Sequence, residues 1–128
     1  MKKIIIVDDA FTLRIQLKNA LEAEGFEVAE ADDGISGLDV ITSNPDASIL
    51  ISDVNMPNMD GLTMLEVVQE KNLLPGAGKI CLTTETSAKM KEQGKKAGLD
   101  AWFTKPLNPK RLKILLELIE KLIAKRSQ

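Results

Sequence analysis

Residues 49–61 read ILISDVNMPNMDG, and this short stretch contains one complete step of an alternating fold. The run from Ile49 to Ile51 is apolar throughout, as expected of a parallel strand that is covered on both faces. Asp53 follows at the end of that run, and Pro57 and Gly61 then favour a turn before a helical pattern begins. A lone Asp at such a place is ordinary, because its side chain bonds to nearby backbone. The fold therefore depends on whether the same step recurs.

The same alternation of strand and helix recurs on both sides of this stretch. Short apolar runs predict strands, and the segments with apolar residues at helical spacing predict helices. The expected strands are Lys3–Val7, Phe26–Ala31, Ser48–Ser52, Lys79–Thr83 and Ala101–Thr104. The expected helices are one that contains Leu13, Leu17 and Leu21 and ends near Gly25, then Ile35–Thr42, Gly61–Lys71, Ser87–Ala97 and Leu107–Lys125. Five β-α units with right-handed crossovers require an open parallel sheet with helices on both faces.

Composition limits the classes of function that the chain can have. With 44% hydrophobic and 28% charged residues and a net charge of −2, its 128 residues fit one soluble globular domain. No apolar run approaches the roughly 20 residues of a membrane helix or resembles a signal peptide, so we expect no membrane insertion and a cytoplasmic location. Without histidine, a His-based zinc site and a Ser-His-Asp triad are impossible. Cys81 lies in an apolar run and is expected to be a buried, inert thiol.

The charges are divided unevenly between the two parts of the chain. Residues 1–70 contain 4 Lys and Arg but 14 Asp and Glu, whereas residues 71–128 contain 13 and 5 respectively. This polarity indicates two faces with different roles, and scattered surface charge is the alternative interpretation.

Polar side chains gather at the ends of four predicted strands, where open parallel sheets bind their ligands. These residues are Asp8 and Asp9, Asp53, Thr83 and Thr84, and Lys105 with Pro106. Two like charges about 4 Å apart repel by about 4 kcal/mol at an effective dielectric constant near 20. Such a cluster therefore needs shifted pKa values or a bound cation. Oxygen ligands without His or Cys favour a hard ion, Mg²⁺ or Mn²⁺.

These residue types suit the chemistry of a phosphoryl group. A metal ion and the Lys105 ammonium can neutralise phosphoryl oxygens, while a Thr hydroxyl donates a hydrogen bond to one of them. Asp53 comes from a separate strand and can act as the nucleophile that forms an aspartyl phosphate.

The sequence resembles the receiver domains of bacterial two-component response regulators, and most of all the stand-alone, CheY-like receivers of chemotaxis. The resemblance covers residues 1–128 as one domain and rests on VDD at 7–9, SDVNMPNMDG at 52–61, TTE at 83–85 and KP at 105–106. The separations of Asp53 from Asp9, Thr83 and Lys105 (44, 30 and 52 positions) also fit the family. The resemblance implies a flavodoxin-like (βα)5 three-layer sandwich with a parallel five-stranded sheet in the order 2-1-3-4-5.

The resemblance also implies roles for the residues at these positions. Asp53 would accept a phosphoryl group from the phosphohistidine of a partner kinase, so that the chain is a switch that catalyses only its own phosphorylation and dephosphorylation. The implied Mg²⁺ ligands are Asp8, Asp9, Asp53 and the backbone carbonyl of Asn55.

Four further positions would act on the phosphoryl group. Lys105 would bind one of its oxygens, and Thr83, which spacing alone prefers to Thr84, would move toward it. Asn55 and Glu85 would set the rate at which water hydrolyses the acyl phosphate.

The resemblance places a signalling surface on the second half of the chain. Trp102 occupies the position of the family's switch aromatic, and a core residue is the alternative interpretation. The expected helix 87–97 has few apolar anchors and an internal Gly94, so we expect it to be locally weak. A basic surface would dock acidic segments of a downstream target such as the flagellar motor switch; a solvated surface is the alternative. Its residues are Lys89, Lys91, Lys95, Lys96, Lys110, Arg111 and Lys113.

Other functions remain open from the sequence. A phosphorelay or pilus-motility intermediary would use the same site. A Mg²⁺-dependent phosphatase of the haloacid-dehalogenase kind would need a second Asp two residues after the nucleophile, where this chain has Asn55. The acidic first loop and the lack of a G-x-x-x-x-G-K-[ST] motif disfavour a nucleotide- or flavin-binding domain. We expect a monomer, a phosphatase as a further partner, no output domain after Lys125 and no nucleic-acid binding.

Overall fold

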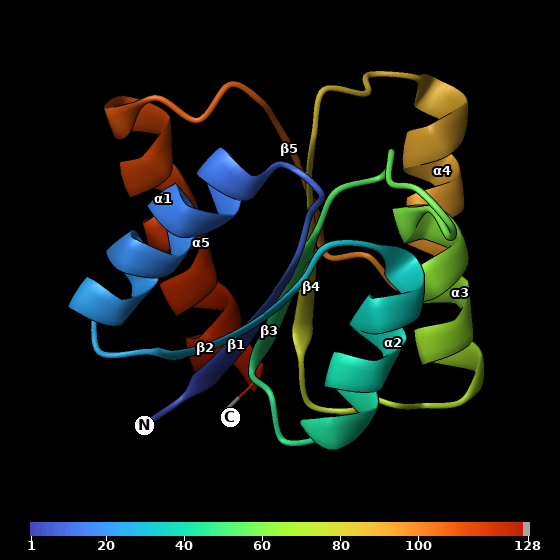
Figure 1. Ribbon diagram of the computed structural model, residues 1–128, viewed down its shortest axis with the longest axis horizontal. Coiled ribbons are helices and arrows are strands. Elements are labelled where there is room, and N and C mark those ends of the chain that lie inside the picture. Colours follow the sequence, from blue (N-terminus) through green and yellow to red (C-terminus); the bar gives the residue numbers. More distant parts are fainter. Residues whose placement is uncertain (127–128) are drawn as a thin grey trace.

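Five parallel strands in the order β2-β1-β3-β4-β5 form the central sheet of the computed structural model, which describes residues 1–126 (Figure 1). The strands are β1 (Lys3–Val7), β2 (Glu27–Ala31), β3 (Ile49–Ser52), β4 (Gly78–Thr83) and β5 (Ala101–Thr104). The helices are α1 (Phe11–Ala23), α2 (Gly34–Ser43), α3 (Gly61–Glu70), α4 (Ala88–Lys96) and α5 (Pro109–Arg126). The predicted flavodoxin-like (βα)5 fold is confirmed.

The helices cover both faces of the sheet, with α1 and α5 on one side and α2, α3 and α4 on the other (Figure 1). Side chains of successive strand residues point to opposite faces, so each strand contributes to both cores. Ile4 and Ile6 of β1 pack in the core on the α1/α5 side, whereas Ile5 and Val7 pack in the core under α2 and α3. β1 and β3 are apolar over Ile4–Val7 and Ile49–Ile51 because both of their faces are buried, whereas the edge strand β2 carries Glu27 and Glu30.

Several boundaries differ from the sequence expectation by one or two residues. Phe26 is buried but precedes β2, and β4 begins at Gly78, one residue before its expected start at Lys79. The last helix begins at Pro109 rather than at Leu107, because Asn108 caps it by accepting a hydrogen bond from Arg111 N (2.9 Å). Leu107 instead packs in the core on the α1/α5 side.

Cys81 lies in the middle of the sheet and is fully buried. Burial, with a smaller contribution from the Asp53 charge, raises the pKa of its thiol to about 12. The expectation of a buried and inert thiol therefore agrees with its place in the fold.

Within residues 1–126, none of the helices has the length and apolar character that a crossing of the lipid bilayer requires.

Candidate functional site

Three carboxylates meet where β1 and β3 end. These strands are neighbours, with Val7 opposite Ser52, and the Asp53 amide donates to the Val7 carbonyl (3.0 Å). Asp8 and Asp53 follow the strands directly and are almost fully buried, at 3% and 7% exposure, whereas Asp9 is exposed. One oxygen from each of Asp8, Asp9 and Asp53 lies within 4.8 Å of the others. The three predicted metal-ligating Asp residues thus form one cluster at the carboxyl edge of the sheet.

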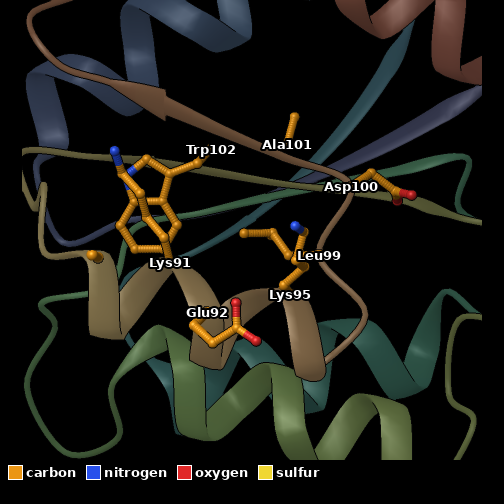
Figure 2. Close-up of a pocket in the computed structure, with 8 residues that line it drawn as sticks. Lys91, Glu92, Lys95, Leu99, Asp100, Ala101 and Trp102 are labelled. Atoms are coloured by element: carbon orange, nitrogen blue, oxygen red, sulfur yellow. The ribbon is translucent and has the colours of Figure 1, made fainter.

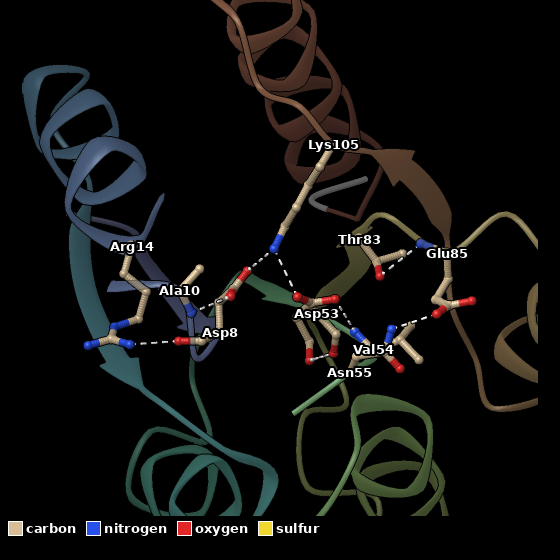
Figure 3. Close-up of polar contacts among 10 residues, drawn as sticks. Asp8, Ala10, Arg14, Asp53, Val54, Asn55, Thr83, Glu85 and Lys105 are labelled. Carbon is tan, nitrogen blue, oxygen red and sulfur yellow. Dashed lines mark hydrogen bonds and ion pairs between the residues drawn. The ribbon is translucent and has the colours of Figure 1, made fainter. Parts of the chain in front are cut away.

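Lys105 bridges the two buried carboxylates (Figure 3). It follows β5 and its Nζ lies 3.0 Å from Asp8 Oδ2 and 2.8 Å from Asp53 Oδ2. Its backbone amide donates to the Thr83 carbonyl (2.9 Å), and the peptide bond to Pro106 is cis. Burial alone would lower the pKa of Lys105, but its bonds to Asp53 and Asp8 outweigh burial and raise that pKa. The ammonium therefore stays charged and offsets part of the repulsion between the carboxylates.

The Asp8 side chain is held in place by a backbone amide two residues further along the chain. Its Oδ1 accepts a hydrogen bond from the Ala10 amide (2.8 Å). Burial raises the pKa of the Asp8 carboxyl, and the bonds from Ala10 and Lys105 oppose that shift without cancelling it. A group that is costly to ionise when buried gains most from a nearby cation, which is consistent with a metal site.

Arg14 is a supporting residue that sequence reasoning did not identify. Its Nη1 donates to the Asp8 carbonyl (2.7 Å; Figure 3). Its Nε donates to Glu30 Oε1 (3.0 Å), so Arg14 connects the start of α1 to β2. Hydrogen bonding from Arg14, helped by Lys18, lowers the pKa of Glu30. Nothing in the spacing of Arg14 within an amphipathic helix distinguishes it from an ordinary surface arginine.

Asn55, Glu85 and Thr83 lie on the side of the site away from Asp8 (Figure 3). The Asn55 amide Nδ2 donates to Glu85 Oε1 (2.6 Å), which joins the loop after β3 to the loop after β4. Thr83 is fully buried as the last residue of β4, and its Oγ1 accepts from the Glu85 amide (3.3 Å), whereas Thr84 is exposed. The two threonines, which the sequence distinguished only by spacing, thus also differ in burial.

Trp102 lies on β5 with its indole turned toward the loop after β4. Its Nε1 donates to the Glu85 carbonyl (2.9 Å), and its ring packs partly buried against the core formed with α2 and α3. Glu85 thus contacts Asn55 through its side chain and Trp102 through its backbone. Trp102 is therefore only partly buried, and its role as the switch aromatic stays a prediction.

A pocket of about 290 Å³ adjoins Trp102 between α4 and β5 (Figure 2). Ala88, Leu99, Ala101 and Trp102 supply its apolar lining. Its charged lining residues are Lys91, Lys95, Glu92 and Asp100.

The lysines of the predicted basic surface do not share one face. Lys91 and Lys95 line the pocket beside Trp102, whereas Lys89 and Lys96 line a separate hollow on α4. Lys113 lies beside Glu24, Glu117 and Glu120 on another part of the surface. Of the predicted basic residues, Lys91 and Lys95 line the pocket beside Trp102, and a docking role for the basic surface stays a prediction.

Gly94 has a packing role in addition to its effect on helix propensity. It is buried, and a Cβ at this position would lie 3.0 Å from Leu99 Cδ2 and 3.5 Å from Trp102 Cζ3. Glycine here allows α4 to approach the pocket-lining residues closely, which is the physical reason for a poor helix former in the middle of the helix.

The donor set fits a hard divalent cation. Three carboxylates offer only oxygen atoms, two of them are buried, and no sulfur or nitrogen ligand is among them. Mg²⁺ prefers such oxygen ligands and commonly binds through a few carboxylates with water completing its shell.

Fold and site together define a class, the parallel α/β domains that hold a lysine-bridged acidic pocket at the carboxyl edge of the sheet. Residues 4–117 match the family described as the response regulator receiver domain, and the chain belongs to that family. It is similar to the chemotaxis protein CheY1 of Helicobacter pylori, with 36% identity over 118 residues that cover 91% of this chain and 95% of that protein. The protein is a receiver domain of the CheY-like chemotaxis response regulators.

Two solved structures illustrate the likeness. A CheY-like receiver domain protein from Methanospirillum hungatei superposes with a TM-score of 0.90 at 33% identity, covering 99% of this chain and 97% of that one. The CheY of a CheX-CheY-BeF3-Mg²⁺ complex from Borrelia burgdorferi has a TM-score of 0.82 at 26% identity, covering 94% and 88%.

Membership of the family establishes the general character of the site. CheY-like receiver domains are phosphoacceptor switches, they bind Mg²⁺ at an acidic pocket, and they interact with kinases and downstream targets. The roles of the individual side chains, the single-domain extent of residues 1–128 and the monomeric state stay predictions.

Proposed function

We propose that Asp53 is the phosphoacceptor of this receiver and takes a phosphoryl group from the phosphohistidine of a partner kinase. The observation that carries the proposal is the Lys105 ammonium, which lies 2.8 Å from Asp53 and 3.0 Å from Asp8 at a cluster of three carboxylates. Asp8, Asp9, Asp53 and the Asn55 carbonyl would hold Mg²⁺, which would supply positive charge against the phosphoryl oxygens.

The transfer proceeds by attack of an Asp53 carboxylate oxygen on phosphorus. A P–O bond forms to Asp53 while the P–N bond to the donor imidazole breaks, and the leaving nitrogen keeps the electron pair of that bond and takes up a proton. Lys105 binds a phosphoryl oxygen and Thr83 donates its hydroxyl hydrogen to another. Water later attacks the same phosphorus, which returns the Asp53 carboxylate and releases phosphate.

The test is to incubate the protein with Mg²⁺ and acetyl phosphate and to measure the intact mass. We expect a labile gain of one phosphoryl group in the wild type. Asp53→Asn should show no gain, because the amide is a poor nucleophile. EDTA should also abolish the gain, because it removes the metal that would neutralise the phosphoryl oxygens. Asp39→Asn, which changes an exposed carboxylate on α2, is the matched control and should be phosphorylated like the wild type. Sustained turnover of unrelated phosphate esters would instead support an aspartyl-nucleophile phosphatase.

The pocket beside Trp102 is the proposed docking site for an acidic segment of a downstream target, such as the flagellar motor switch. Its apolar lining suits the apolar side chains of a partner segment, and the two exposed lysines suit its acidic ones. Asp100 is already paired with Arg126 (2.9 Å), so its charge opposes an acidic partner less than its position suggests. The bond from Trp102 to Glu85 connects this pocket to the loop that follows Thr83.

The double variant Lys91→Glu/Lys95→Glu is expected to weaken binding of the target at least about tenfold and to flatten its salt dependence. The physical reason is that two attractive charges at the pocket become repulsive. Lys89→Glu/Lys96→Glu makes the same change of net charge away from Trp102 and should weaken binding much less. Titrations of the phosphorylated protein at two ionic strengths measure both effects, and equal losses in the two double variants would contradict the proposed pocket.

A further inference from the structure

The loop between β3 and α3, residues 53–60, is tied to the loops on both of its sides. On one side, Asn55 Nδ2 donates to Glu85 Oε1. On the other side, Asn58 Nδ2 donates to Asp33 Oδ2 (2.6 Å), and the Gly34 amide donates to the Met59 carbonyl (3.1 Å). This loop carries Asn55, whose carbonyl is the proposed backbone ligand of Mg²⁺, so its conformation bears directly on the metal site.

Asp33 uses its two carboxylate oxygens for different tasks. Oδ1 accepts from the Ser36 amide (2.8 Å) and caps the N-terminus of α2 as part of a capping box. Oδ2 is left free of the cap and receives the Asn58 amide. One side chain thus fixes the start of α2 and attaches the metal-site loop to it.

Asn58 has a backbone conformation that few residues adopt without cost. Its φ is 68°, in the left-handed region that Asn tolerates better than most other side chains and that glycine adopts freely. A glycine at this position would supply the same backbone without the side-chain amide. The choice of Asn therefore adds the bond to Asp33 to what the turn alone requires.

We propose that the Asp33–Asn58 hydrogen bond is a positioning contact for the metal site, which holds the β3–α3 loop so that the Asn55 carbonyl is preorganised to bind Mg²⁺. This inference rests on the proposed function, since it assumes that Asn55 contributes a ligand. Asp33 and Asn58 are not among the proposed Mg²⁺ ligands. They affect the metal site only by holding the β3–α3 loop in position. Contacts that orient ligands from outside the first coordination sphere commonly tune metal affinity.

The test is the Mg²⁺ affinity of two variants, measured by calorimetry without any phosphodonor. Asn58→Gly keeps the φ of the turn and removes the amide, and Asp33→Ser keeps a capping oxygen for α2 but cannot reach Asn58. Each is expected to raise the Mg²⁺ dissociation constant about fivefold. Because both act through one bond, adding Asn58→Gly to Asp33→Ser should have no further effect.

Two control variants separate positioning from general effects. Asn72→Gly makes the same substitution at the other non-glycine residue with positive φ in residues 1–126 (50°), and Asp32→Ser removes a neighbouring charge from the same loop. We expect Asn72→Gly to bind Mg²⁺ more tightly than Asn58→Gly, and Asp32→Ser to bind it more tightly than Asp33→Ser, with both controls close to the wild type. Melting temperatures without Mg²⁺ report any loss of fold.

The outcomes distinguish this inference from the proposed function. A wild type that binds no Mg²⁺ would overturn the proposed site and the positioning role together. A wild type that binds Mg²⁺, with Asn58→Gly and Asp33→Ser as tight as it or no weaker than their controls, would overturn the positioning role alone.

Discussion

Lys105→Met is expected to lower the free energy of unfolding by about 3 kcal/mol at pH 8, because it leaves two buried carboxylates without their shared counter-ion. The Met side chain fills much of the same space, so little of the loss comes from packing. Urea unfolding followed by the fluorescence of Trp102, the one tryptophan of the chain, measures the change.

The loss should be smaller at pH 5 than at pH 8. The pKa of Asp8 is already raised in the folded wild type, and removal of the ammonium raises it further. Above the unfolded value of 3.8 the native state then binds more protons than the unfolded chain, so its stability falls as pH rises through the raised pKa. Lowering the pH from 8 to 5 favours uptake of a proton by the Asp8 carboxyl, whose pKa is raised, and recovers part of the loss.

Lys79→Met is the matched control for this prediction. Lys79 is also partly buried, but its ammonium meets the carbonyl oxygens of Leu74 and Ala77 (3.3 and 3.4 Å) rather than carboxylates, and burial lowers its pKa. Its replacement should cost far less, with little change between pH 5 and 8. An equal loss for Lys105→Met at both pH values would show that the carboxylate pair is not what makes Lys105 important.

The strands and the composition of the site could be predicted because both follow from local pattern. A run such as Ile4–Val7 is apolar at every position, as expected of a short strand covered on both faces, and Asp8 and Asp53 stand at the ends of such runs. Once the sheet is parallel, topology alone brings Asp8 and Asp53 together on adjacent strands.

Contacts between loops could not be predicted from the sequence. The bonds from Asn58 to Asp33 and from Asn55 to Glu85 join residues 25 and 30 positions apart, and no periodicity records them. The arrangement of the predicted basic residues was hidden for a similar reason, since counting lysines along α4 does not show that Lys91 and Lys89 line different hollows.

Gly61→Ala is the second substitution for which we expect a large loss of stability, of about 2–3 kcal/mol. Gly61 is the first residue of α3, and its amide donates to the Val54 carbonyl (2.8 Å). An added Cβ would collide with the Asp53 carbonyl oxygen and would lie 3.0 Å from Ser52 Oγ. Helix propensity alone favours Ala over Gly by about 1 kcal/mol, so a net loss would show that the collision dominates.

The collision cannot be relieved without disturbing the site. The Asp53 carbonyl accepts a hydrogen bond from Ser52 Oγ (2.8 Å), and the amide of the same peptide group, Val54 N, donates to Asp53 Oδ1 (2.6 Å). Rotating that peptide therefore breaks buried hydrogen bonds and moves the Asp53 carboxylate. We therefore expect Gly61→Ala to weaken Mg²⁺ binding as well as to lower the urea midpoint. Gly76→Ala adds the same methyl group where nothing lies within 4 Å and should be neutral or slightly stabilising. If the two variants unfolded at the same urea concentration, the close approach of α3 to Asp53 would not be what requires glycine at position 61.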